Sequence, residues 1–111
     1  MPIYIIQGRY SNHAIRGMVS QAEDRAPALA SLMESVGGRL LAYYVTFGDS
    51  DFHVTVEAPD ESAMLSALAV AGSGQSISAL STSLALPTSE ASKAFARAKG
   101  IASRFKAAGA D

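Results

Sequence analysis

Residues 39–58, RLLAYYVTFGDSDFHVTVEA, decide the fold, because two β-rich runs are separated there by a short turn. The first run covers residues 39–47 and the second covers residues 51–58, with Gly48, Asp49 and Ser50 between them. Branched and aromatic side chains favour strands, and a short connection that contains glycine is typical of a hairpin. The segment therefore predicts an antiparallel pair of strands.

A strand and a helix flank this hairpin on each side. Upstream, IYIIQGRY at residues 3–10 predicts a strand, and a helix begins near Asp24 with Pro27 in its first turn. Downstream, Pro-Asp-Glu at residues 59–61 opens a second helix, and residues 75–86 predict a fourth strand. The order β-α-β-β-α-β predicts an α+β domain of the ferredoxin-like type, with one antiparallel sheet and both helices on one face.

A further helix is predicted beyond this domain, in the alanine-rich segment at residues 89–108. Phe95, Ala98, Ala102 and Phe105 recur in it at helical spacing. We therefore expect a domain of residues 1–88 and a C-terminal helical extension of residues 89–111.

The charge is distributed unevenly between the two parts. Residues 1–86 hold four basic and eight acidic groups, whereas residues 87–111 hold five basic and two acidic groups. A basic extension on an acidic body indicates either docking on the acidic body of its own dimer or simply a solvated helix face. Binding of nucleic acid is disfavoured, because the basic stacking surface that single strands need is missing.

The sheet face turned away from the helices predicts how the chain assembles. If the hairpin loop has three residues, Tyr43 pairs with Thr55, and this face receives four large apolar side chains: Leu41, Tyr43, Val45 and Phe47. Monomers rarely expose such a patch, so we expect two sheets to pack face to face in a homodimer, a dimeric α/β barrel. A loop of two or four residues would instead bring the neighbouring side chains to this face, namely Leu40, Ala42, Tyr44 and Thr46.

Four segments of the chain resemble the GYD-domain family. They are MPIYIIQGRY at residues 1–10, AIRG at 14–17, ESVGGRLL at 34–41 and TFGDSDFHVTVEAPD at 46–60. The glycine and aspartate of the family name fall on Gly48 and Asp51, whereas its tyrosine falls at Ser50. The resemblance implies the βαββαβ fold and a homodimer. Related dimeric α/β barrels include cofactor-independent monooxygenases, isomerases, haem-handling enzymes and ligand-binding modules.

His53 is the first candidate for catalysis, because it lies within a predicted strand with Asp51 and Thr55 two residues away on the same face. An imidazole oriented by a carboxylate accepts a proton near neutral pH. We expect His53 to act as a base supported by Asp51 and Tyr43, in a chamber between the two sheets. Arg9 and Thr55 are the expected ligand-binding residues.

Structural roles remain open for the same residues. His53 is also interpreted as a hydrogen-bonded interface residue, Asp51 as a cap of the hairpin loop, and Tyr43 as interface packing. Two functions therefore remain. One is a small-molecule-handling homodimer, such as a cofactor-independent oxygenase or isomerase, and the other is a non-catalytic ligand-binding, regulatory or oligomerisation module.

The composition argues against several other classes. There is no cysteine, hence no disulfide and no thiolate zinc site. Asp51, His53 and Glu57 share a face, but same-face neighbours stand about 7 Å apart along a strand, so we expect no metal site and no cofactor. No apolar run approaches the roughly 20 residues that span a bilayer, and the first residues lack a signal-peptide pattern. We expect a cytoplasmic protein without membrane or nucleic-acid partners.

Overall fold

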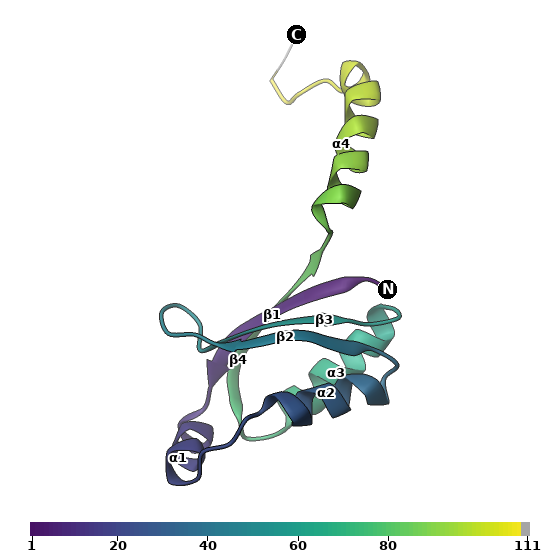
Figure 1. Ribbon diagram of the computed structural model, residues 1–111. Coiled ribbons are helices and arrows are strands. Elements are labelled where there is room, and N and C mark those ends of the chain that lie inside the picture. Colours follow the sequence, from purple (N-terminus) through teal and green to yellow (C-terminus); the bar gives the residue numbers. More distant parts are fainter. Residues whose placement is uncertain (110–111) are drawn as a thin grey trace.

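The computed structural model describes residues 1–109 and has a mixed α+β architecture (Figure 1). Its sheet is antiparallel, with the strand order β2-β3-β1-β4. Helices α2 and α3 cover one face of this sheet, and no described helix packs on the other, which we call the uncovered face. The described strands are β1 (Ile3–Tyr10), β2 (Arg39–Val45), β3 (Phe52–Glu57) and β4 (Ile77–Ala85), and the helices are α1 (Asn12–Ser20), α2 (Ala26–Ser35), α3 (Glu61–Ser73) and α4 (Thr88–Ile101).

Local chemistry fixes where the two covering helices begin. Pro27 lies in the first turn of α2, where its missing N–H breaks no helical hydrogen bond. Asp60 caps α3, because its side chain accepts a hydrogen bond from the backbone N–H of Ala63 at 2.8 Å. After α2 the chain turns at Gly37, whose φ of 80° favours glycine. The predicted first turns of both helices are thus confirmed.

The hairpin loop contains four residues, 47–50, so the four-residue alternative is the correct one and the three-residue alternative is wrong. The backbone N–H of Thr46 donates to the carbonyl oxygen of Asp51 at 2.8 Å, which adds one pair beyond the ends of β2 and β3. The Thr46 hydroxyl also donates to the carbonyl oxygen of Ser50 at 2.6 Å. These two hydrogen bonds set the register of the whole hairpin.

In this register Tyr43 and Tyr44 point to the opposite sides of the sheet from those that a three-residue loop predicts. Tyr43 pairs with Val54, and Tyr44 pairs with His53. Directly paired residues point to the same side of a sheet, and Val54 is buried against the helices. Tyr43 therefore faces the helices, whereas Tyr44 lies on the uncovered face beside His53.

The uncovered face is consequently more polar than expected. A register shift between Leu40 and Ala42 also returns Leu40 to the helix side, where it packs on the core. Val45, paired with Phe52, points to the helix side as well, at an exposed end of the sheet. The strand registers place on the uncovered face Ile3, Ile5, Gln7, Arg9, Arg39, Ala42, Tyr44, His53, Thr55, Glu57, Ala79, Ser81, Ser83 and Ala85.

The core lies between the sheet and helices α2 and α3. Met33 of α2 and Val56 of β3 are its largest fully buried side chains. Gly8 permits close packing across the central strand: a Cβ there would touch the backbone carbonyl of Ala79 and lie 2.6 Å from the ring of Phe52. The aromatic ring and β4 can therefore both close on β1.

Helix α4 leaves the body of the protein and buries none of its residues (Figure 1). It ends at Ile101 and continues as a 3-10 turn at Ala102–Arg104, so the predicted helix at 89–108 is too long and Phe105 lies outside it. The radius of gyration, 18.2 Å, exceeds the roughly 13 Å of a compact chain of similar length. The predicted domain limit at residue 88 falls at the start of α4, and residues 110–111 of the predicted extension lie outside the described residues.

None of the helices in residues 1–109 combines the length and the apolar character that crossing a bilayer requires.

Candidate functional site

A cavity of about 370 Å³ lies between the sheet and the helices α2 and α3, and we call it the inner cavity. Its volume is within the range of small-molecule sites, and apolar side chains supply most of its wall. Among the residues that line it are Ile6, Leu29, Leu32, Met33, Phe52, Val54, Met64, Ala67, Leu68 and Ala71, together with Tyr10, Arg25, Tyr43 and Ser76.

Two tyrosine hydroxyls meet in the wall of the inner cavity. The hydroxyl oxygens of Tyr10, at the end of β1, and Tyr43, on β2, are 2.5 Å apart. The ring of Phe52 lies beside Tyr10, with its centroid 5.0 Å from that of Tyr10. Two neutral hydroxyls hold two protons and use one of them for their mutual hydrogen bond. The pair therefore retains one donor for a ligand.

The surroundings keep Tyr10 protonated. Burial raises the pKa of Tyr10 above its ordinary value, and the hydrogen bond with Tyr43 raises it further. The nearby positive charge of Arg25 acts in the opposite direction. Because the raising effects dominate, Tyr10 remains a neutral phenol over the physiological pH range.

The raised pKa of Tyr10 predicts a loss of stability in alkali. Above pH of about 10 an unfolded chain releases the Tyr10 proton, whereas the folded chain retains it. The unfolded state then binds fewer protons, so the free energy of unfolding falls as the pH rises. Urea unfolding between pH 9 and about 12 should show a steeper fall for the wild type than for Tyr10→Phe. Equal slopes for the two proteins would contradict the assignment.

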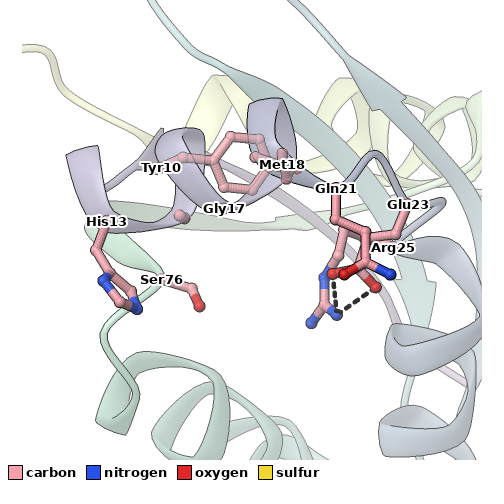
Figure 2. A pocket seen from close by; sticks show the side chains of 9 residues that line it. Tyr10, His13, Gly17, Met18, Gln21, Glu23, Arg25 and Ser76 are labelled. Atoms are coloured by element: carbon pink, nitrogen blue, oxygen red, sulfur yellow. Dashed lines mark hydrogen bonds and ion pairs between the residues drawn. The ribbon is translucent and has the colours of Figure 1, made fainter.

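A second, more polar pocket of about 410 Å³ adjoins the inner cavity, and we call it the outer pocket. Both are lined by Tyr10, Arg25 and Ser76. In Figure 2, His13 and Ser76 lie toward one end of the outer pocket and Arg25 toward the other, with the ring of Tyr10 between them. The outer pocket therefore forms a polar entrance to the apolar cavity.

Arg25 provides the cationic group at this entrance. A guanidinium nitrogen of Arg25 lies 3.3 Å from a carboxylate oxygen of Glu23, and both side chains are about half exposed (Figure 2). A solvent-exposed ion pair of this kind is weak and is easily exchanged for a ligand. Arg25 and the tyrosine pair together suit a carboxylate or another oxygen acceptor, because a guanidinium presents several N–H donors in one plane.

The predicted catalytic trio is not brought together. His53 lies on the uncovered face, and its Nδ1 is 3.2 Å from the amide nitrogen of Gln7. Tyr43 lies on the helix side of the sheet, so its predicted support of His53 is wrong. Thr55 shares the uncovered face with His53, two residues along β3.

Asp51 and Arg9 link the hairpin loop to the end of β1. A carboxylate oxygen of Asp51 accepts a hydrogen bond from the backbone N–H of Tyr10 at 3.0 Å, and the other lies 3.5 Å from the guanidinium of Arg9. The same guanidinium lies 3.4 Å from the carbonyl oxygen of Asp49. These contacts differ from the expected cap of the hairpin loop: the Asp51 side chain binds the end of β1 from which Tyr10 projects, and Arg9 holds the loop.

The sequence reasoning missed Tyr10 and Arg25. The sequence alone predicts Tyr10 only as the last residue of a strand and assigns no role to Arg25. The alternation of side chains along the first strand could have indicated Tyr10, because Tyr10 is on the same side as Tyr4 and Ile6, which are buried. Their meeting with Tyr43 depends on the hairpin register, which the sequence left open.

Within the part of the chain that the structure describes, no three histidine, aspartate or glutamate residues gather closely enough to hold a metal ion.

Comparison with known proteins gives one match. The family model described as the GYD domain matches residues 4–95, which is most of the chain. No curated protein and no solved structure matches.

Proposed function

The chain belongs to the GYD domain family, and from this premise we propose that it binds a small, largely apolar molecule with one anionic or hydrogen-bond-accepting group. The observation that carries the proposal is the inner cavity. Its wall is mostly apolar, and its polar side chains are the Tyr10–Tyr43 pair, Ser76 and Arg25. A concave apolar site with a few convergent polar groups is the usual form of a small-molecule site.

The polar groups select the chemistry of the ligand. The tyrosine pair offers one O–H donor and the guanidinium offers N–H donors, so the matching group is an oxygen acceptor that carries negative charge. The remaining surface suits an aliphatic chain or an aromatic ring. An apolar carboxylate meets both requirements.

We also propose that the fold is the ferredoxin-like one and that two copies pair through their uncovered faces. In the order β2-β3-β1-β4, β3 separates the parallel strands β1 and β2, and β1 separates β3 and β4, as in a split βαβ arrangement. The uncovered face carries Ile3 and Ile5 on the central strand β1 and, on β2 across β3, Tyr44, which is 63% exposed. Apolar side chains at the centre of such a face support pairing.

A matched pair of tyrosine variants tests the ligand site. The Tyr10→Phe/Tyr43→Phe variant removes the donor from the cavity, whereas Tyr4→Phe/Tyr44→Phe removes two hydroxyls from tyrosines that do not line it. The probes are 1-anilinonaphthalene-8-sulfonate and its neutral counterpart N-phenyl-1-naphthylamine, followed by fluorescence. The first variant should bind the sulfonate about tenfold more weakly, because a hydrogen bond to a charged group contributes about 1.5–3 kcal/mol.

The neutral probe serves as the control for cavity shape. It should bind both variants with nearly wild-type affinity, because it carries no charged acceptor for the tyrosine pair. If the sulfonate binds both variants equally well, or does not bind the wild type, the proposed site is refuted.

A second candidate function is proton transfer by His53 in a chamber between two paired sheets. The observation that favours it is the hydrogen bond that the amide nitrogen of Gln7 donates to Nδ1 of His53, which fixes the orientation of the imidazole and leaves an Nε2–H as proton donor. An oxygenase or isomerase would place its substrate against the free Nε2. The two candidates predict ligands on opposite sides of the same sheet.

A further inference from the structure

We propose that the C-terminal arm, defined as residues 86–105, docks on a second copy of this chain. The inference extends the proposed pairing of the uncovered faces, and it is independent of the ligand site, whose lining residues all precede the arm. The partner that we propose for the arm is a surface of a second copy of this chain.

The first observation is an exposed apolar stripe along α4. Ala91, Ala94, Ala98 and Ile101 follow one another at helical spacing of three or four residues, and Phe95 lies beside them, four residues after Ala91. Phe95 is 72% exposed and Ile101 is 58% exposed, and Phe105 beyond the helix is 78% exposed. The charged residues Lys93, Arg97 and Lys99 occupy the remainder of the helix surface.

The second observation is the length of α4. Its 14 residues make a helix about 21 Å long, which is marginal in water when nothing packs against it. Gly100 lowers its intrinsic propensity further. A helix with this stripe is stabilised mainly by burying the stripe, so the arm needs a surface to dock on.

The third observation is the direction of the arm. Figure 1 shows α4 extending away from the sheet on the side opposite to α2 and α3, the side of the uncovered face. Only Leu86 and Pro87 connect β4 to α4, and the ring of Pro87 restricts its φ. Such a short, stiff connection directs the helix away from its own sheet and toward a copy paired with the uncovered face.

The receiving surface has matching properties. Ile3 and Ile5 of β1 and Tyr44 of β2 supply apolar area on the uncovered face, and Phe47 adds more in the hairpin loop; Tyr44 is 63% and Phe47 98% exposed. The net charges of the two parts also favour attraction between copies: residues 1–86 as a whole have eight acidic and four basic groups, and residues 87–111 have two acidic and five basic groups. In a twofold exchange each copy buries its arm on the other copy, because such an interface uses the same surface on each subunit.

Photo-crosslinking tests where the arm docks. The substitution Phe95→p-benzoylphenylalanine puts a crosslinker on the stripe of the full-length chain. After irradiation at a concentration where the protein is dimeric, we expect a covalent dimer on a denaturing gel. Mixing ¹⁵N-labelled and unlabelled chains should give crosslinked peptides that contain one labelled and one unlabelled partner. Crosslinks within one chain, or none at all, would overturn the proposal.

Two alanine substitutions in the same helix provide a matched test by sedimentation equilibrium. Ala98→Glu puts a carboxylate on the stripe, whereas Ala96→Glu puts the same group on the opposite side of α4. The first should weaken dimerisation by about tenfold or more, and the second should change it by less than about twofold. Equal effects of the two variants, or dimerisation unchanged by deletion of residues 87–111, would refute arm docking.

Binding of 1-anilinonaphthalene-8-sulfonate to the same variants separates this inference from the proposed function. Ligand binding should persist in the arm variants, because the inner cavity is built from residues 6–80. If arm docking is wrong, dimerisation of the arm variants equals that of the wild type. If the ligand site is wrong, the wild type does not bind the probe.

Discussion

Replacing Ala71 with phenylalanine is expected to abolish binding of 1-anilinonaphthalene-8-sulfonate to the inner cavity, with a loss of affinity of about 100-fold or more. Ala71 lies on α3, one turn after the buried Ala67, and both line the cavity. A phenyl ring at this position would occupy space that a ligand needs, and lost packing contacts reduce affinity directly.

Ala69→Phe is the matched control for this substitution. Ala69 is exposed on the same helix and does not line the cavity, so its substitution should leave probe affinity within about twofold of the wild type. The two variants carry the same added ring and differ only in its direction. Retained probe binding in Ala71→Phe would show that the ligand lies elsewhere.

Met33→Ala is expected to have the largest effect on stability, a decrease of about 2–5 kcal/mol in the free energy of unfolding. Met33 is fully buried between α2 and the sheet, and it also lines the inner cavity. Truncation removes apolar contacts and enlarges an existing space, and the surrounding residues cannot relax fully into it. Urea unfolding followed by circular dichroism measures the change.

Leu65→Ala is the control for the stability measurement. Leu65 lies on α3 with 66% of its surface exposed, so its truncation should change the free energy of unfolding by less than about 0.5 kcal/mol. A comparable loss for both variants would mean that the core does not lie under α2 and α3 as described.

Most of the secondary structure could be predicted from local chemistry. Pro27 and Asp60 mark the first turns of α2 and α3, and the alternation of Phe52, Val54 and Val56 identifies the buried side of β3. These signals depend on residues close in sequence. Their interpretation does not require knowledge of the tertiary structure.

The side of the sheet to which each β2 side chain points could not be predicted, because it depends on the number of residues in the hairpin loop. Thr46 pairs with Asp51 where the three-residue loop predicted Phe47, and this one-residue change of register reverses the side chains of residues 42–46. The irregularity at Leu40–Ala42 adds a second change of parity. The predicted trio around His53 was wrong at Tyr43 for this reason.

The site itself depends on contacts between distant segments. Tyr10 and Tyr43 are 33 residues apart in sequence, and their hydroxyls meet only when β3 lies between their strands in this register. Arg25 joins them because α2 starts above the end of β1, at the border of both pockets. Neither spacing nor composition indicates such a meeting.

The most direct test of the account is a ¹H–¹⁵N correlation NMR titration of the full-length protein with decanoate, an apolar carboxylate. The ligand site under α2 and α3 predicts saturable shift changes at the amides of Leu29, Tyr43 and Ala67, which line the inner cavity. Changes confined to Gln7, His53 and Thr55 on the uncovered face, or no saturable change at any amide, would contradict it.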